Sequence, residues 1–518
     1  MKSFTRLPFW LSDDDVKSLR AVNKSLNAAV DRATWEVLPI VLNLSRDNLD
    51  LGMTMLEVYA VSLGERGQVR DNISIRERCW ALTPDEPDTE EIIEARRRLP
   101  EVSSKALSAL KGLTAIRWRP VENDPKPVHI AIMRSIGLLL HLVDFQINAE
   151  TCANIPPIHF LKNGSLRKLV IRQTFPHISD SAQFITSLVT VLIHNPLLDH
   201  LELDTAALSD RHLLPFQHLL RSIPTNTVEL RALMLRGWSV PAEAIPQVRP
   251  HLRLLRSINL CPWAPNRHPQ GPESCRALWR SLLDSGLEAP LPLRHISCTQ
   301  ICEELLDLLR LESIQGLESL EVNDTCEDTD EDYNRLAQQF LDQVFHHRYQ
   351  GTLKELTLIP SFTGDWTIGL GNLDRFDGCK ELTYLCVALD PDEVSPGAGD
   401  EDVVVRYLLR AVGCESDART LQASFIACIS RLPNLSRVVF RPVCSRANRF
   451  AQRQQDHPWI AKQRILENIK QSVEKAAIPN TFSRALRIIL KGYNPVKPTL
   501  VFVSDDGDGA LTRFRQLE

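Results

Sequence analysis

The chain has 518 residues, of which 43% are hydrophobic and 24% charged, and its formal net charge is -5. This length exceeds what a single compact core normally organises, and the composition is that of an ordinary globular protein. The near balance of 60 basic against 65 acidic residues disfavours a general nucleic-acid binder or a protein that coats anionic membranes.

The cysteines and the apolar stretches indicate the cellular compartment in which the protein works. The 12 cysteines are scattered, as expected of small buried hydrophobes in a reducing environment. The first residues lack the apolar core of a signal peptide. The most apolar stretch, 128–143, is interrupted by His129, Arg134 and His141 and is too short to span a bilayer. We therefore expect a cytoplasmic or nuclear protein with no membrane partner and no nucleic-acid partner.

Residues 1–45 predict one amphipathic helix near the amino-terminal end. Ser12 and Asp15 have the spacing of a capping box, which places the start of the helix there. One face of this helix is apolar and carries Leu19, Val22 and Leu26. The segment ends in an apolar, strand-like run at 40–44.

This segment resembles the second half of an F-box. That family opens on Leu-Pro, starts a helix with Asp-Leu, continues with Val-Cys-Lys-x-Trp and closes on a later Trp. The corresponding residues here are Leu7-Pro8, Asp15-Val16, Val22-Asn23-Lys24-Ser25-Leu26 and Trp35. The resemblance implies docking on the adaptor subunit of an SCF-type ubiquitin ligase, through Leu7, Pro8, Asp15, Val16, Leu19, Val22 and Leu26.

The chain departs from the F-box pattern in two places. Between Leu7-Pro8 and Asp15-Val16 barely one helical turn fits, where the family has a longer helix. Asn23 and Leu26 replace the usual Cys and Trp. Two interpretations stay open: a truncated F-box that still docks, and a remnant that has lost its adaptor. A sequence start that omits a true first helix would produce the same pattern.

Residues 46–110 predict a helix-rich spacer that also serves as an N-terminal cap for residues 111–440. Helical spacing of apolar residues runs over 53–62 and again over 89–98. In the second of these stretches Glu precedes Arg, which is the order that the helix dipole favours.

From 111 to 440 one apolar phrase, Leu-x-x-Leu-x-Leu with substitutions, returns eleven times. Its last two apolar positions are two residues apart, the period of a strand with one buried face. Between the phrases, helical spacing runs over 182–194, 210–223, 274–285, 302–311 and 333–347. The phrases begin at Leu113, Leu142, Leu166, Leu198, Leu230, Leu255, Leu293, Leu317, Leu353, Leu382 and Leu435.

Strand–helix units at such intervals are typical of leucine-rich repeats, which must stack on one another to bury their apolar faces. The predicted fold class is α/β: a leucine-rich-repeat solenoid with a curved parallel sheet inside and helices outside, preceded by the α-helical F-box-like cap. An acidic loop rich in Pro and Gly interrupts it near 390–402. Residues 441–518 form a C-terminal linker and capping segment, with strands near 486–490 and 500–503.

The residues that alternate with the buried positions of each strand point to the concave face, which is the expected ligand surface. We predict that a target protein contacts eleven side chains there. They are Lys168, Arg172, His200, Glu202, Asp204, Met234, Arg236, Glu321, Asn323, Glu355 and Tyr384.

The sequence carries no catalytic or metal-binding motif: no phosphate-binding loop, no nucleophile elbow, no His-Glu-x-x-His and no paired Cys-x-x-Cys. We expect a non-catalytic protein with no cofactor and no metal. An F-box followed by leucine-rich repeats, as in fungal families of this kind, implies a substrate receptor of an SCF-type ubiquitin ligase. The alternative is a leucine-rich-repeat interaction scaffold without a ubiquitin link.

Overall fold

The computed structural model describes most of 90–389, residues 432–442 and 470, and strands at 40–42, 73–76, 477–479, 487–490, 500–505 and 511–517. Gaps within 90–389 fall at 110–112, 121–125, 151, 153–155, 176–177, 208–212, 222, 224–227, 262–269, 300, 315, 324–329, 361–363, 368–372 and 377. The F-box-like residues 7–35, the expected helix at 53–62 and the acidic loop at 390–402 lie outside the described residues.

The chain divides into two compact units. The first comprises Met1–Leu254 with Asn266–Gly271, and the second Leu255–Pro265 with Pro272–Glu518. This division falls inside the run of repeats. The four segments expected from the sequence, 1–45, 46–110, 111–440 and 441–518, stay a prediction.

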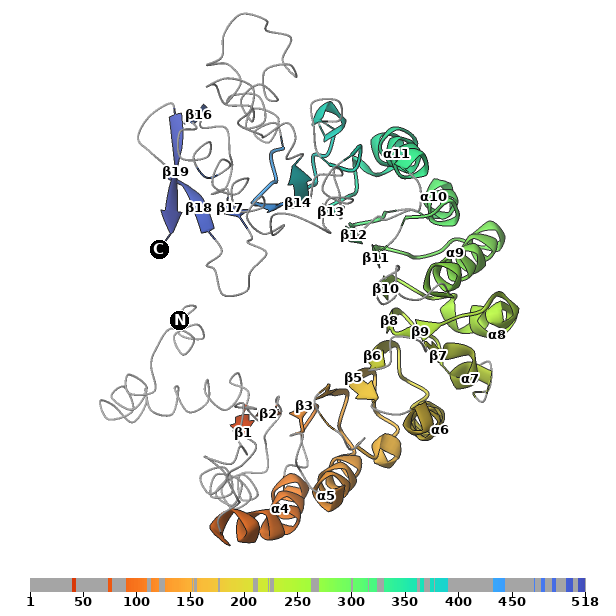
Figure 1. Cartoon of the computed structure of the whole chain (residues 1–518), viewed down its shortest axis with the longest axis vertical. Helices are drawn as coiled ribbons and strands as arrows, with labels where there is room; N and C mark the ends of the chain where they lie inside the picture. The colour runs from red at the N-terminus through yellow and green to blue at the C-terminus, as the bar shows by residue number, and fades with distance from the viewer. Residues whose placement is uncertain are drawn as a thin grey trace, which may run out of the picture. The chain divides into compact units, whose positions relative to one another are not determined.

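In the first unit a parallel sheet follows the order of the chain, and each strand pairs with the next. Its strands are β1 (Ile40–Leu42), β2 (Ile73–Arg76), β3 (Ala115–Arg119), β4 (Asp144–Ala149), β5 (Lys168–Phe175), β6 (His200–Ala207) and β8 (Ala232–Arg236). The connecting helices are α4 (Glu90–Ala109), α5 (Lys126–Gly137), η3 (Ile158–Phe160), α6 (Ile178–His194) and α7 (Phe216–Arg221). Figure 1 shows α4, α5 and α6 on one side of β3–β6.

The end of the first unit is closely packed around a glycine. Two short strands, β7 (Leu214–Pro215) and β9 (Trp238–Ser239), pair there, followed by η4 (Ala242–Ala244), α8 (Ile245–Val248) and η5 (Arg249–Leu252). Gly237, between β8 and β9, has a φ of +78°, and a Cβ at this position would collide with the carbonyl oxygen of Thr205. Only glycine fits both the conformation and the space.

The second unit repeats the arrangement. Its parallel strands are β10 (Ser257–Cys261), β11 (His295–Cys298), β12 (Ser319–Asn323), β13 (Glu355–Ile359), β14 (Tyr384–Leu389), β15 (Arg437–Pro442) and β17 (Arg487–Leu490). Three strands continue the sheet in antiparallel fashion: β18 (Leu500–Asp505), β19 (Leu511–Leu517) and β16 (Ala477–Pro479). The helices are α9 (Gln270–Glu288), α10 (Glu303–Arg310), α11 (Asp330–Gln339), η6 (Phe340–Tyr349) and η7 (Leu373–Phe376).

All eleven apolar phrases form strands, and each strand begins two residues after the first leucine of its phrase. Those leucines are at most 1% exposed. The first leucine is buried just before the strand, and the next two apolar residues are buried within it. The predicted α/β class, with a parallel sheet flanked by helices, is therefore confirmed for the repeats. The strands expected near 486–490 and 500–503 are also present, as β17 and β18.

Three helices differ from their predictions. Within the helix expected over 210–223, Leu214–Pro215 form β7 and the helix α7 begins only at Phe216. α4 continues through Pro100 to Ala109, although helical spacing had been expected only to residue 98. Its buried Leu99, Val102 and Leu107 extend the apolar face, and this burial offsets the hydrogen bond that proline removes. The single helix expected over 333–347 becomes a π-helix at η6. There the buried Phe340 and Phe345 are five residues apart, the π-helical hydrogen-bond interval, and their rings stack at 6.1 Å.

Candidate functional site

The predicted contact residues lie on the side of each sheet opposite its described helices, which we call the helix-free face because none of the helices that the structure describes covers it. Seven of them are on β5, β6 and β8 of the first unit, and four are on β12, β13 and β14 of the second. On β6, β8 and β12 they alternate with buried residues, whereas on β13 and β14 the residues after Glu355 and Tyr384 are buried in succession. The structure thus gathers them into two sets, one per unit. Their role in binding stays a prediction.

In the first unit the strand register aligns the seven side chains in three rows. Lys168 lies beside His200, and Glu202 lies beside Met234. The third row consists of Arg172, Asp204 and Arg236. Adjacent strands are about 4.8 Å apart, so side chains in the same row are within contact distance.

Within this set, Glu202 interacts electrostatically with His200, Lys168 and Arg172. His200 Nε2 donates a hydrogen bond of 2.7 Å to Glu202 Oε1, and the glutamate side chain is 24% exposed. This bond is the main reason why the pKa of Glu202 lies below its ordinary value, and the charges of His200, Lys168 and Arg172 lower it further, against the opposing effect of partial burial. Glu202 is therefore an ionised carboxylate at neutral pH, held in a basic environment.

Asp204 is paired in a similar way. Arg236 Nη1 lies 3.3 Å from Asp204 Oδ2, and the aspartate side chain is only 13% exposed. The pair joins β6 to β8 across the sheet. Arg172, on the other side of Asp204 in the same row, is exposed and makes no hydrogen bond or ion pair with any described residue.

In the second unit, Glu321 and Glu355 accept hydrogen bonds from side chains on the same strand or on the preceding strand. Glu321 accepts hydrogen bonds from Ser297 Oγ at 3.1 Å and from Asn323 Nδ2 at 2.6 Å. Glu355 accepts one from Ser319 Oγ at 3.1 Å. These bonds fix the carboxylates on the face without neutralising them, so β12 and β13 present an acidic surface.

A ladder of ion pairs precedes the strands of the second unit. Lys354 Nζ lies 2.8 Å and Arg294 Nη1 2.5 Å from the carboxylate of Glu318. The hydrogen bond from Lys354, followed by that from Arg294, lowers the pKa of Glu318. Sequence reasoning missed this ladder. Its signal is that all three residues stand directly before a strand, where consecutive repeats place them side by side.

An apolar strip occupies the helix-free face of β14, β15 and β17. Cys386, Val439 and Ile489 are in register and are 1%, 2% and 9% exposed. Tyr384 packs against this cluster, and the Arg437 guanidinium lies 5.3 Å from the centre of its ring. Burial, together with the neighbouring Cys386, raises the pKa of Tyr384 to about 12. Tyr384 is therefore a half-buried residue at the edge of the apolar cluster.

The sequence signal for this strip is an unbroken apolar triplet. Strands β14, β15 and β17 read Leu-Cys-Val, Val-Val-Phe and Ile-Ile-Leu, where β6 and β12 alternate as Leu-Glu-Leu and Leu-Glu-Val. A strand that is apolar on both faces is buried on both faces. The accessible part of the helix-free face in the second unit is consequently β10, β11 and β12, with Glu355 of β13, whereas Thr357 further along β13 is buried.

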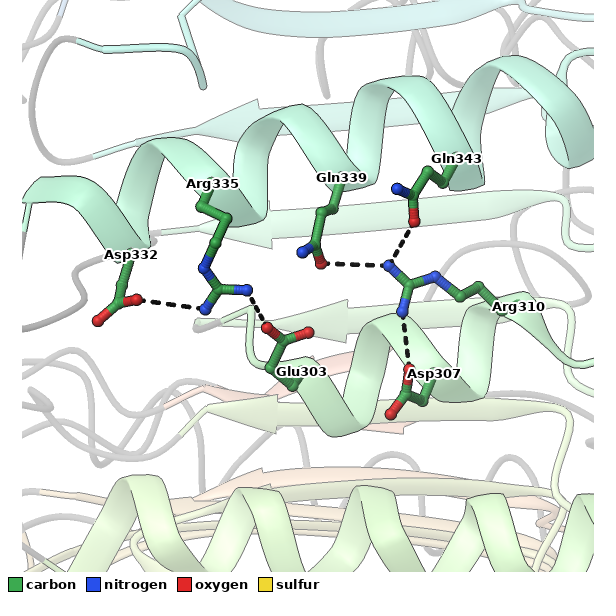
Figure 2. Close-up of polar contacts among 7 residues, drawn as sticks. All are labelled: Glu303, Asp307, Arg310, Asp332, Arg335, Gln339 and Gln343. Carbon is green, nitrogen blue, oxygen red and sulfur yellow. Dashed lines mark hydrogen bonds and ion pairs between the residues drawn. The ribbon is translucent and has the colours of Figure 1, made fainter.

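The helix side of the second unit carries a polar network instead of predicted contact residues (Figure 2). Arg310 donates to Asp307 at 2.7 Å, to Gln339 at 3.1 Å and to Gln343 at 2.8 Å. Arg335 donates to Asp332 at 3.2 Å and also contacts Glu303. The two arginines thus join α10 to α11 and η6, as Figure 2 shows.

We expect this network to make a small contribution to stability. Replacing Arg310 with methionine keeps the apolar stem and removes three hydrogen bonds, so the free energy of unfolding should fall by about 1 kcal/mol. Replacing Arg335 with methionine removes contacts that are more exposed and should cost about 0–1 kcal/mol. Urea denaturation followed by circular dichroism measures both. A loss of several kcal/mol for either variant would contradict the network's assignment to the surface.

Among the described residues, no three His, Cys, Asp or Glu side chains are grouped so that they could hold a metal ion. Within the same residues, no helix is long and apolar enough to cross a membrane.

No protein-family model and no curated protein matches the sequence. Among solved structures, an internalin from Listeria monocytogenes is similar, with 12% sequence identity and a TM-score of 0.29. The similarity covers 68% of this chain and 89% of the internalin chain. The fold assignment rests on the register and on the buried leucines described above. Both units are of the leucine-rich-repeat type.

Proposed function

We propose that this protein is a non-catalytic interaction scaffold that binds a target protein on its helix-free face. The observation that carries the proposal is the set of charged side chains on β5, β6 and β8. They come from three successive repeats, lie in register, and are held by ion pairs and hydrogen bonds on a face that carries no described helix. Such pre-positioned charges confer specificity and speed in protein association.

We further propose that the protein is a substrate receptor of an SCF-type ubiquitin ligase, working in the cytoplasm or nucleus. The support for this step is the F-box resemblance of residues 7–35, which lie outside the described residues. The receptor would act by holding its target close to a charged conjugating enzyme, through effective concentration. The alternative, a scaffold with a non-functional F-box remnant, requires only the repeats.

The first test addresses the helix-free face. Glu202→Lys combined with Glu321→Lys reverses one charge in each unit, and we expect loss of partner proteins captured from cell extract by cross-linking. The matched control is Glu243→Lys with Glu312→Lys, which reverses two exposed charges outside the strands and should leave the captured set unchanged. Circular dichroism checks that both variants fold. Equal loss in both variants would place the binding elsewhere.

The second test separates the receptor from the plain scaffold. Purified full-length protein should retain the SCF adaptor subunit in a pull-down, and Leu19→Asp with Val22→Asp should abolish retention. Lys17→Asp with Arg20→Asp, away from the apolar face of the predicted helix, serves as the control. A folded wild-type protein that retains no adaptor would leave the scaffold alternative.

A further inference from the structure

Four basic side chains lie on the helix-free face of β3 and β5, at positions where the described residues offer them no direct acceptor. Arg117 and Arg119 on β3 and Arg172 on β5 are exposed, and Lys168 on β5 is half-buried. None of them makes a hydrogen bond or an ion pair with another residue that the structure describes. Arginine in such a position is a donor of five N–H groups that has no acceptor.

The acidic side chains of the same face already have donors. Glu202 accepts from His200 at 2.7 Å, Asp204 pairs with Arg236, and Asp144 accepts from the amide of Gln146 at 3.2 Å. Over β3, β4, β5, β6 and β8 the face carries five Lys or Arg and three Asp or Glu. The surplus is therefore positive, and it lies on β3 and β5, where the side chains without a hydrogen bond or ion pair are.

The register fixes the spacing of these cations. Asn148 pairs with Arg172, and Trp118 pairs with Ile147, so Arg119 falls in the same row as Asn148 and Arg172. Arg119 and Arg172 are then two strand spacings apart, about 9.6 Å, and Arg117 and Arg119 are about 6.8 Å apart along β3. An extended peptide in the polyproline II conformation has three residues per turn and rises about 3.1 Å per residue, so the side chains of residues i and i+3 lie on the same side, about 9.3 Å apart.

We propose that this basic patch, formed by Arg117, Arg119, Lys168 and Arg172, binds an extended acidic segment of the target protein. The inference rests on the proposed function and specifies the chemistry of the partner. Carboxylates three residues apart in the segment match the spacing of Arg119 and Arg172, and the amide of Asn148 is available as a donor between them. Arginine pairs with carboxylates through two parallel hydrogen bonds, which gives both affinity and orientation.

The same surface is less suited to nucleic acid. Its described residues on β3–β8 include no Phe, Tyr or Trp on the helix-free face, so there is no platform for base stacking. Glu202 and Asp204 lie directly beside the patch and would repel a phosphate backbone. Discrete carboxylates can avoid these two positions, because a peptide carries charge only at chosen residues.

The test uses a fluorescein-labelled peptide of four Glu-Gly-Ser repeats and full-length protein, in fluorescence anisotropy at about 50 mM salt, where screening is modest. We expect the peptide to bind, and a matched peptide with Gln in place of Glu to bind at least about tenfold more weakly. Arg119→Gln with Arg172→Gln should weaken the acidic peptide about tenfold, since each exposed charge contact is worth about threefold. Higher salt should weaken it as well.

The matched control is Lys162→Gln with Arg253→Gln, which removes two exposed cations of the same unit that lie outside its strands. It should change the affinity by less than about twofold. The inference is overturned if the acidic peptide does not bind, or if both double variants weaken it equally. Tighter binding of a uridine dodecamer, lost with Arg119 and Arg172, would make the patch a nucleic-acid site instead.

The outcome can be separated from that of the proposed function. If capture of partner proteins depends on Glu202 and Glu321 but the acidic peptide is indifferent to Arg119 and Arg172, the inference fails and the scaffold stands. If capture is indifferent to the helix-free face while the peptide binds as expected, the scaffold proposal fails and the patch remains an acidic-peptide site.

Discussion

Replacing Leu320 with alanine is expected to lower the free energy of unfolding by about 2–5 kcal/mol. Leu320 is 2% exposed on β12, and the register places it between Ile296 of β11 and Leu356 of β13, which are also buried. Its side chain therefore fills the space between successive repeats. Alanine would lose this apolar contact and leave a cavity, because a repeat packed on both sides can relax only partly.

The control is the neighbouring Glu321→Gln, on the opposite face of the same strand. Ser297 and Asn323 donate to different oxygens of the carboxylate, and glutamine keeps one acceptor oxygen and turns the other into an amide donor, so this change should cost about 1 kcal/mol. Urea denaturation followed by circular dichroism measures both variants. Equal losses for Leu320→Ala and Glu321→Gln would contradict the assignment of buried and helix-free faces.

The repeats could be predicted from the sequence because each of them contains the same spacing of apolar residues. In each of the eleven phrases the leucine before the strand is buried, and the period of two after it selects the strand and its face. The placement of Lys168, Glu202 and Glu321 on the helix-free face follows from this alternation alone. Their partners could not be predicted in the same way, since contacts such as Arg236–Asp204 join residues 32 positions apart.

Other features depended on tertiary packing that overrides local preference. Pro100 predicts the end of a helix, but the buried Leu99 and Val102 keep α4 continuous. The π-helix at η6 follows from the packing of its aromatic residues, which a count of helical spacing does not register. The apolar strip of β14, β15 and β17 was present in the sequence as unbroken triplets. A strand of these repeats leaves its helix-free face open only where polar residues occupy every second position.

The second large effect concerns pH. His129, on α5, is 0% exposed, and its ring packs edge-on against Trp118 at 5.6 Å between centroids. Burial lowers the pKa of His129 from its ordinary value of 6.5 to about 4. In the unfolded chain the same imidazole takes up a proton near pH 6.5, whereas in the folded protein it stays neutral until about pH 4. Stability is therefore lost as the pH falls between these values.

The size of this loss follows from the shift. One pKa unit corresponds to about 1.4 kcal/mol, so His129 should cost the folded protein about 3 kcal/mol by pH 4, relative to pH 7. His129→Leu keeps the apolar volume beside Trp118 and removes the proton site. We expect its free energy of unfolding to exceed that of the wild-type protein by an amount that grows by about 3 kcal/mol between pH 7 and pH 4.

Denaturation of both proteins at a series of pH values measures this difference directly. The contributions of the carboxylates to the pH dependence cancel, because these groups titrate alike in both proteins. His218→Leu, which removes an exposed histidine from α7 in the same unit, is the matched control, and its pH dependence should follow the wild-type curve. A difference between His129→Leu and wild type that stays constant with pH would mean that His129 reaches water in the folded protein. The packing of α5 against β3 would then be looser than its buried side chains indicate.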